Sequence, residues 1–431
     1  MSARFDAVIS GGSFAGSAAA AALSRLGMKV LVCEPGLADH RRLAGELIQA
    51  PGAQALLDLG LLDVAMEAGA VPSAGFAVLP EPEGEPVLLS YAETPGCRST
   101  GIALEHAKLA QALLDHVARL PGVEVRTDRV SRAHGFRGPQ VHVETARGDS
   151  FECAVVVAAD GRGSKLRDAA GIAVAKGEPV RMLGVRVEGP LPHEGRGHVF
   201  LAGKAPVLAY RISREAVRVL FTSVGDDAQP VPEDFAALPA GLAAQVREGL
   251  KGASSSAVVQ SLTPKRSALG RLFLVGDSGG CVHPITATGV SFCAKDALLL
   301  EEALRDTDGD VVAASQVYSE ERTGPLQTRV ALGPLLAETL AGQQPDTAAL
   351  RRGLLRYWRN DVAGRGTSLG LLSTHDARFD VLAKEYVKVI AHALVEVAAT
   401  RGPREVLHVG GHLLGKGTSL ALEALRQRRD A

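Results

Sequence analysis

Hydrophobic residues recur with two different periods along the chain, and these periods predict two kinds of sheet. Ala7–Ile9 and Lys29–Cys33 are short apolar runs, and the alanine-rich stretch between them is typical of a buried helix. Together they predict a parallel βαβ unit. Residues 71–98 and 180–264 instead alternate Val, Leu and Phe with polar residues, which predicts antiparallel strands of a second sheet. From Gln316 onward the pattern is mostly helical.

The turn after the first strand is rich in small residues, which let a backbone approach a phosphate closely. The N-terminus of the following helix adds N–H groups and a favourable dipole. Glu34 ends the second strand, where its carboxylate can bond a ribose 2′-hydroxyl and favours the adenosine of FAD or NAD over a 2′-phosphate. Ser13 replaces the usual middle glycine and is small enough to keep this approach. The predicted nucleotide-binding residues are Gly11, Gly12, Ser13, Phe14, Ala15, Gly16 and Glu34.

A second apolar run, from Phe151 to Ala159, predicts a buried strand that ends in Asp160-Gly161 at the start of a helix. Taken alone, the pair indicates an Asp-Gly turn with Ser164 as the helix cap. The pair lies in the sequence between the glycine-rich turn at residues 11–16 and a Gly-Asp pair at Gly276-Asp277. This order favours a contact of Asp160 with the same nucleotide.

A third apolar run, Leu272–Val275, ends abruptly at Gly276 and Asp277 and leads through a glycine-containing turn into a helix. Asp277 would lie at the carboxyl end of a strand, where its carboxylate can bind a ribityl hydroxyl. Helix N-terminal amides beside Gly289 can face an anionic ring. We expect Pro284 and Gly289 to position this ring, and we assign no side chain as acid or base.

These three segments, in this order, resemble the single-component flavoprotein monooxygenases of the para-hydroxybenzoate hydroxylase fold over roughly residues 1 to 330. The resemblance implies that they bind the ADP part, the pyrophosphate side and the ribityl chain of one FAD. The membrane-inserting apolar helices of squalene epoxidases have no counterpart here. Other segments are nevertheless similar to squalene epoxidases, one branch of this fold family: Arg42–Gly52 with Asp58–Leu61, His283–Thr286 with Gly289, and Leu354–Tyr357 with Gly370–Ser373.

The same resemblance implies further site residues. Phe76 occupies the place of a tyrosine near the epoxidation site, so either a hydroxyl is lost there or Phe76 is a core residue. His106 stands where the family has an arginine that contacts FAD. Further FAD contacts are implied for Arg42, for Leu47 beside the flavin, for the backbone of Val130 at the adenine and for the backbone of Val290 at the isoalloxazine.

We therefore predict an α/β protein with a Rossmann-like FAD-binding domain, a second, mainly antiparallel β-sheet substrate domain and a C-terminal helical region. A loop is expected from Gly364 to Thr374. The expected FAD-binding domain comprises residues 1–75, 99–179 and 265–330, the substrate domain 76–98 and 180–264, and the helical region 331–431.

Charge and cysteine content exclude several other classes of function. The 47 basic residues balance 48 acidic ones, so the chain has no field that would attract nucleic acid. The five cysteines are scattered without metal spacing, which predicts reduced thiols and no metal site. Cys281 and Cys293 flank the predicted flavin turn, residues 283–289, and are more simply apolar packing residues than redox groups. His283 is more simply a turn histidine bonded to backbone than an acid or base.

The sequence predicts a cytoplasmic protein, since we find neither a signal peptide nor an apolar run of membrane-spanning length. The amphipathic stretch from Tyr386 to Val397 either packs on the protein or makes a peripheral membrane contact. No particular oligomeric state is indicated.

The resemblance implies an enzyme that uses FAD, NADH or NADPH, and O2, and that inserts one oxygen atom through a flavin C4a-hydroperoxide. Aromatic residues make up only 4% of the chain, and the substrate half is rich in Ala, Leu and Val, which favours a small lipophilic substrate. The implied reaction is epoxidation of a double bond in an isoprenoid or prenylated aromatic compound of secondary metabolism. An aromatic hydroxylase, a geranylgeranyl-reductase-type flavin reductase and a non-catalytic nucleotide-binding module stay open. A halogenase is disfavoured because Trp358 is the single tryptophan and the paired-tryptophan motif is missing.

Overall fold

The computed structural model describes residues 4–37, 43–224, 232–252 and 254–401, together with 406, 409–411, 413 and 415. Its first part is a six-stranded sheet of order β18-β19-β12-β1-β2-β8, parallel except for the pair β18 and β19. The three segments predicted to bind one nucleotide supply the adjacent strands β1, β12 and β19. The bounds are β1 Ala7–Ser10, β2 Val30–Cys33, β8 Val123–Arg126, β12 Val155–Ala158, β18 Ala268–Leu269 and β19 Leu272–Leu274.

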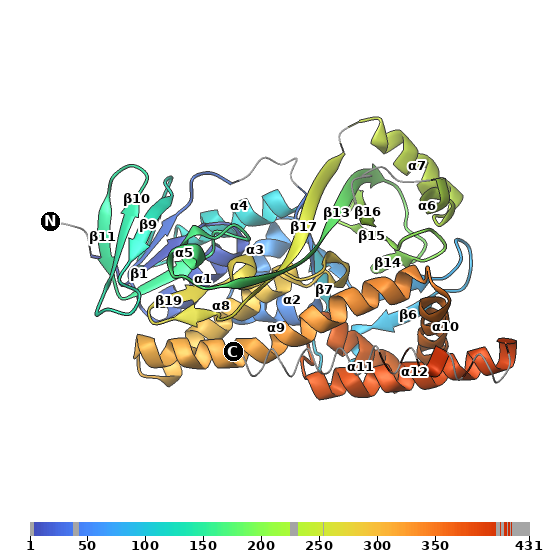
Figure 1. The fold of residues 1–431 in the computed structure, drawn as a ribbon. Helices are drawn as coiled ribbons and strands as arrows, with labels where there is room; N and C mark the ends of the chain where they lie inside the picture. Colours follow the sequence, from blue (N-terminus) through green and yellow to red (C-terminus); the bar gives the residue numbers. More distant parts are fainter. Residues whose placement is uncertain are drawn as a thin grey trace.

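Helices cover one face of this sheet, and a small antiparallel sheet covers the other (Figure 1). Ala7 and Ile9 of β1 face the helices, whereas Val8 between them faces the small sheet, as the alternation of a strand requires. The alanines of α1 let it pack closely against α8 and α4. The bounds are α1 Phe14–Arg25, α4 His106–Val117, α8 Gly289–Asp306, β9 Val130–His134, β10 Val141–Thr145 and β11 Ser150–Cys153.

The apolar run from Phe151 to Ala159 forms two strands, so the prediction of one buried strand was wrong. In β11 the residues alternate between exposed and buried, because one face of the small sheet packs on the parallel sheet and the other face is exposed. In β12 all residues are buried, because this strand lies inside the parallel sheet with layers on both faces. Ala154 separates the two strands, and its N–H donates to the carbonyl of Asp6.

The second sheet is mainly antiparallel, as predicted, and has the order β17-β13-β16-β15-β14-β5-β6. Its one parallel pair is β14 with β5. Leu183 and Val219 lie on the face covered by α7 (Ala240–Leu250), whereas Met182 and Leu220 lie on the face that packs with the C-terminal helices. The strands are β5 Gly75–Leu79, β6 Val87–Ser90, β13 Val174–Glu188, β14 Gly197–Phe200, β15 Val207–Arg211, β16 Ala216–Val224 and β17 Ser255–Pro264, and the short helix before α7 is α6 Pro232–Ala236.

In the described part of the C-terminal region, four helices lie below the second sheet in Figure 1: α9 Val311–Ala341, α10 Pro345–Asn360, α11 Val362–Ser373 and α12 Phe379–Arg401. The stretch from Tyr386 to Val397 lies in α12, where Val389, Ile390 and Ala393 pack into the core beside α10, as the packing alternative predicted. None of the helices in the described ranges is both long and apolar enough to cross a membrane.

The prediction of a loop from Gly364 to Thr374 was wrong, because Gly364 to Ser373 belong to α11 and Thr374 is its C-cap. Asp361 caps this helix, and its carboxylate accepts from the N–H of Gly364. The glycines are needed for packing: a Cβ on Gly364 would overlap the ring of Tyr357, and one on Gly366 would overlap the carbonyl oxygen of Glu93. Gly364 and Gly366, within the predicted loop, are therefore sites of close helix packing.

Shorter elements connect the two sheets. Residues between β2 and β8 in the sequence form a three-stranded sheet of order β3-β7-β4. Helix α2, from the same part of the chain, packs on α8. The bounds are β3 Leu47–Ile48, β4 Val71–Ser73, β7 Gly101–Ala103, α2 Ala50–Asp58, α3 Leu62–Glu67 and α5 Lys165–Ala169. The described ranges also contain the 3-10 turns η1 Tyr91–Glu93, η2 Gly276–Gly279 and η3 Pro284–Thr286.

Candidate functional site

The turn between β1 and α1 needs glycine at two positions. Gly11 has φ +98°, and a Cβ there would lie 2.5 Å from the carbonyl oxygen of Ala159. A Cβ on Gly16 would overlap the carbonyl oxygen of Gly11. Ser13 stands before α1 and makes no side-chain cap bond, so the first N–H groups of the helix point into this turn without a capping side chain. The arrangement suits an anionic group placed against the helix end.

Glu34 closes the same turn from the end of β2. Its Oε2 accepts from the N–H of Gly12 at 2.7 Å, and its Oε1 accepts from the N–H of Gly36 at 3.0 Å. Each carboxylate oxygen can accept a further hydrogen bond, so these contacts leave capacity for a ribose hydroxyl. Glu34 thus shapes the turn, while its contact with a ribose stays a prediction.

The Asp160-Gly161 turn brings the second segment beside the first, because Ala159 contacts Gly11. Asp160 Oδ2 accepts from the N–H of Lys165 at 3.0 Å, whereas the buried Oδ1 has no partner in the described ranges, and burial raises the pKa of Asp160. Ser164 caps α5 as the turn pattern predicted. An unsatisfied buried carboxylate oxygen is a place where a ligand donor fits.

Arg167 joins the second segment to the third. This arginine is buried on α5, and its guanidinium donates to the carbonyl of Ser278 in η2 at 3.1 Å. It also donates to the carbonyl of Arg162 at 2.9 Å. The sequence analysis did not single out Arg167, because its partner lies far away in the chain.

Gly276 joins the third segment to the first. Its φ is +66°, and a Cβ there would lie 2.8 Å from Cys293 Sγ and 2.9 Å from Ala15 Cβ. Asp277 follows in η2, three residues after the end of β19, and is partly buried. The three segments that lie far apart in the sequence therefore meet around the start of α1.

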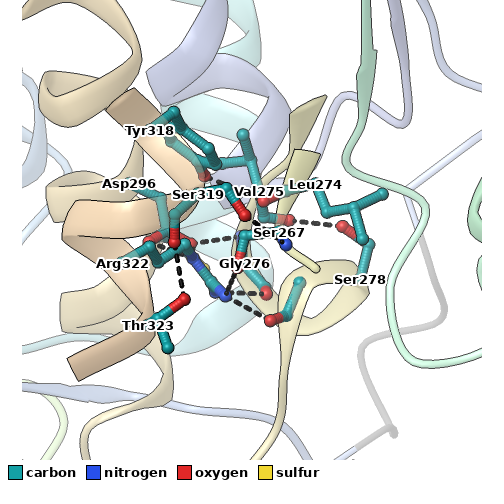
Figure 2. Close-up of polar contacts among 12 residues, drawn as sticks. Ser267, Leu274, Val275, Gly276, Ser278, Asp296, Tyr318, Ser319, Arg322 and Thr323 are labelled. Atoms are coloured by element: carbon teal, nitrogen blue, oxygen red, sulfur yellow. Dashed lines mark hydrogen bonds and ion pairs between the residues drawn. The ribbon is translucent and has the colours of Figure 1, made fainter. Parts of the chain in front are cut away.

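A buried ion pair supports this turn from behind (Figure 2). Arg322 of α9 donates to both carboxylate oxygens of Asp296 on α8, at 2.8 and 2.9 Å. Asp296 also accepts from the N–H of Gly276 at 2.8 Å, and Arg322 donates to the carbonyl of Gly279. Burial lowers the pKa of Arg322, but Asp296 outweighs this effect and the net pKa is raised. The pair fixes both ends of η2.

His283 precedes η3 and behaves as the turn histidine that the sequence favoured. Its Nδ1 accepts from the N–H of Ile285 at 3.2 Å, and burial lowers its pKa to about 4. Pro284 starts the 3-10 turn, and Ala287 ends it in the left-handed region at φ 48°. A neutral imidazole whose Nδ1 is already engaged is a structural group of this turn.

The N-terminus of α8 brings four predicted residues near one another. Gly289 begins the helix after Thr288, which makes no side-chain cap bond. The side chain of Val290 packs so closely on Gly45 that a Cβ there would overlap it. His106 Nδ1 is hydrogen bonded to the carbonyl of Gly45 at 2.9 Å, so it lies beside this contact between the loop before β3 and α8. Leu47, two residues on, is buried in β3.

Arg329 is a buried cation that the sequence analysis missed. Its guanidinium lies 3.5 Å from the ring centroid of Phe292, and its Nε donates to Thr288 Oγ1 at 3.2 Å. Its Nη1 is buried and has no partner among the residues described. Burial lowers the pKa of Arg329 to about 10, so the group is positive at neutral pH. It adds positive charge to the start of α8.

Gln49 links the flavin turn to the substrate half. Its side-chain amide donates to the carbonyls of Thr286 and Leu372, and its Oε1 accepts from the hydroxyl of Tyr91 at 3.1 Å. Phe76 lies in the core of the second sheet, with its ring against Gly197. Tyr91, which the sequence analysis did not select, therefore places a phenolic hydroxyl beside Gln49.

The remaining predicted residues lie apart from this cluster or outside the description. Val130 begins β9 and is buried under the parallel sheet. Arg42 lies outside the described residues. Cys281 and Cys293 are buried, and burial raises the pKa of Cys281 to about 12, which fits packing residues. No cluster of His, Cys, Asp or Glu in the described part of the chain could hold a metal ion.

The cradle fits FAD by its own chemistry. Helices α1 and α8 begin with backbone N–H groups that no side chain caps. Gly11 and Gly16 keep Cβ atoms out of the turn between β1 and α1. Asp160 Oδ1 and Arg329 Nη1 offer a buried acceptor and a buried donor that lack protein partners in the described ranges. A dinucleotide with hydroxyls, phosphates and an electron-poor ring can satisfy these groups.

Comparison with known proteins decides the family. Residues 4–322 match the family model described as an FAD binding domain. The chain belongs to this FAD-binding family. The predicted FAD cofactor and the predicted fold class are thereby confirmed.

Among curated relatives, this family member is 30% identical to squalene monooxygenase SE1 of Panax ginseng over 319 residues, which cover 70% of this chain and 58% of the relative. It is 27% identical to the squalene monooxygenase of Mus musculus over 413 residues, 90% of this chain and 71% of the relative. The predicted squalene epoxidase-like resemblance is confirmed, although the chain spans less than three fifths of the ginseng protein.

Solved structures support the fold. PqsL, a probable FAD-dependent monooxygenase from Pseudomonas aeruginosa, superimposes with a TM-score of 0.68 at 22% identity, over 79% of this chain and 97% of that chain. The p-nitrophenol 4-monooxygenase PnpA from Pseudomonas putida DLL-E4 gives a TM-score of 0.70 at 20% identity, over 90% and 99%.

Proposed function

We propose that this protein is an FAD-dependent monooxygenase that takes electrons from NADH or NADPH and inserts one atom of O2 into a lipophilic substrate. The proposed reaction is epoxidation of a double bond in an isoprenoid or prenylated aromatic compound. The single observation that carries the proposal is the meeting of the Gly11, Asp160 and Gly276 segments in one cradle, in a chain whose relatives are named squalene monooxygenases.

The residues of this chain would bind and orient the cofactor. Bound FAD would supply the electron transfer and oxygen activation that no protein side chain here provides. The N–H groups at Gly289 and Val290, together with Arg329, would stabilise negative charge on the ring in a water-poor site. His283 would stay neutral and keep the turn rigid, since its pKa is about 4 and its Nδ1 is engaged. Asp277 would bind the ribityl chain.

An apolar cavity supports the lipophilic substrate class. It lies among α9, α10, α11 and α12, has a volume of about 70 Å³, and is lined largely by leucines. Leu372 lines this cavity, and its carbonyl accepts from Gln49, whose side chain also bonds Thr286 of the flavin turn. The apolar lining suits part of a hydrocarbon chain better than a charged acid.

Turnover with and without oxygen tests the proposal. The purified protein, loaded with FAD, is given NADH or NADPH and a panel of prenylated quinolones, quinones and squalene. We expect a product from at least one alkene in air and none under argon. A reduced product formed under argon would contradict the monooxygenase assignment and indicate a flavin reductase that saturates the double bond. Flavin reoxidation without any product would indicate a binding module.

A further inference from the structure

A second cavity, of about 360 Å³, lies beside α8 and is separate from the apolar one. Its size falls within the range of about 300 to 1,000 Å³ that is usual for small-molecule sites. Three cationic or ionisable basic side chains face it, and none of its described lining residues is acidic. The lining is Pro51, Gln54, Gly96, Cys97, Arg98, Ser99, Lys295 and His375.

Lys295 is a partly buried cation with too little negative charge around it. Its Nζ donates to the carbonyl of Thr374 at 2.7 Å, and the adjacent Asp296 is already bonded bidentately by Arg322. Burial and the charge of Arg329 lower the pKa of Lys295 to about 8. A buried charge that lacks a counter-ion is unfavourable, so an anion bound here would stabilise the protein.

Arg98 and His375 provide the other basic groups. Arg98 is exposed at the cavity and has no hydrogen bond or ion pair within the described part of the chain. His375 Nε2 bonds the carbonyl of Pro95 at 3.0 Å; because a carbonyl only accepts, Nε2 carries the proton and Nδ1 is the free nitrogen.

The cavity lies next to the flavin turn without being part of it. Lys295 is six residues beyond Gly289 on α8, which corresponds to about 9 Å along the helix. Pro51 and Gln54 lie on α2, which follows directly after Gln49. A ligand whose anionic group is bound at Lys295 is therefore within a small molecule's length of the turn.

We propose that this Lys295 pocket binds the phosphate or carboxylate group of a small molecule. Two sources can supply the anion: the phosphates of the nicotinamide reductant, or an acidic group on the substrate. Charge-assisted bonds from a guanidinium and an ammonium recognise either anion. The proposal concerns binding alone, so it is tested without turnover and its failure is distinguishable from failure of the proposed oxygenation.

Titration calorimetry of the FAD-loaded protein at low ionic strength tests the pocket. The probes are NADPH, NADH, inorganic phosphate and octanoate. We expect one phosphate or carboxylate probe to bind with a stoichiometry of one, and added salt to weaken it. Competition between NADPH and inorganic phosphate identifies the reductant as the source, whereas binding of octanoate alone identifies an acidic substrate.

Two variants locate the binding. Arg98→Gln should lower the affinity for the probe about tenfold, within the range for loss of one charge-assisted hydrogen bond. Lys295→Gln should weaken binding of the probe at least as much. If Lys295→Gln does not fold, Arg98→Gln still tests the pocket, because Arg98 is exposed and its replacement should leave the fold intact. Arg132→Gln, an exposed arginine on β9, is the matched control and should bind like wild type. The proposal is overturned if no probe binds, or if Arg98→Gln binds as tightly as wild type.

Discussion

Replacing Asp296 by asparagine should destabilise the protein more than any exposed carboxylate substitution. Asp296 and Arg322 are 2% and 1% exposed, so the variant leaves a buried guanidinium without its counter-charge. Removal of one partner of such a pair costs about 3–5 kcal/mol. With an unfolding entropy of roughly 2.1 cal/mol/K per residue, the 431-residue chain should melt about 3–6 °C lower.

The assay is differential scanning fluorimetry in saturating FAD, with Asp380→Asn as the control. Asp380 forms an exposed pair with Lys384 on α12, and its loss should leave the melting temperature unchanged. The double variant Asp296→Leu with Arg322→Met should recover only part of the lost stability, because it removes the unpaired charge but also removes the partners of the Gly276 N–H and the Gly279 carbonyl. Equal melting of Asp296→Asn and Asp380→Asn would refute the role of the pair.

Three further variants test other parts of the account. Gly11→Ala forces a Cβ towards the carbonyl of Ala159 at φ +98°, so FAD binding measured by fluorescence should weaken at least about tenfold; unchanged affinity would contradict the cradle. Asp277→Ala should weaken FAD binding by a similar factor, and full FAD retention would show that the ribityl contact is misassigned. His198 is 1% exposed and burial lowers its pKa to about 4, so below about pH 6.5 the unfolded chain takes up a proton that the folded chain refuses. Wild type should therefore lose stability between about pH 6.5 and 4, and His198→Phe should lose less, as urea titrations can measure.

Local sequence signals predicted the architecture because they are strong where strands end. A buried strand followed by a glycine turn marks the segments at Gly11, Asp160 and Gly276, and parallel strands bring their carboxyl ends to one edge. The second sheet followed from the alternation along β13 and β16. These features depend on neighbours in the chain, which a sequence displays directly.

Features that depend on distant neighbours escaped prediction. Arg322, Arg329 and Tyr91 take their roles from partners brought together by folding, and as sequence letters they look like ordinary helical or surface residues. Gly364 and Gly366 suggested a loop, because a glycine required by helix packing has the same local signature as one required by a turn. Only the neighbouring helix and the carbonyl of Glu93 distinguish the two cases.

The most direct test of the proposed function is the origin of the oxygen in the product. The FAD-loaded protein is supplied with NADH or NADPH and an accepted prenylated alkene under ¹⁸O2, and the product is analysed by mass spectrometry. We expect one ¹⁸O atom in each product molecule, with label absent when ordinary O2 is used in ¹⁸O-labelled water. An unlabelled product under ¹⁸O2, or a saturated product without added oxygen, would contradict the assignment as a monooxygenase.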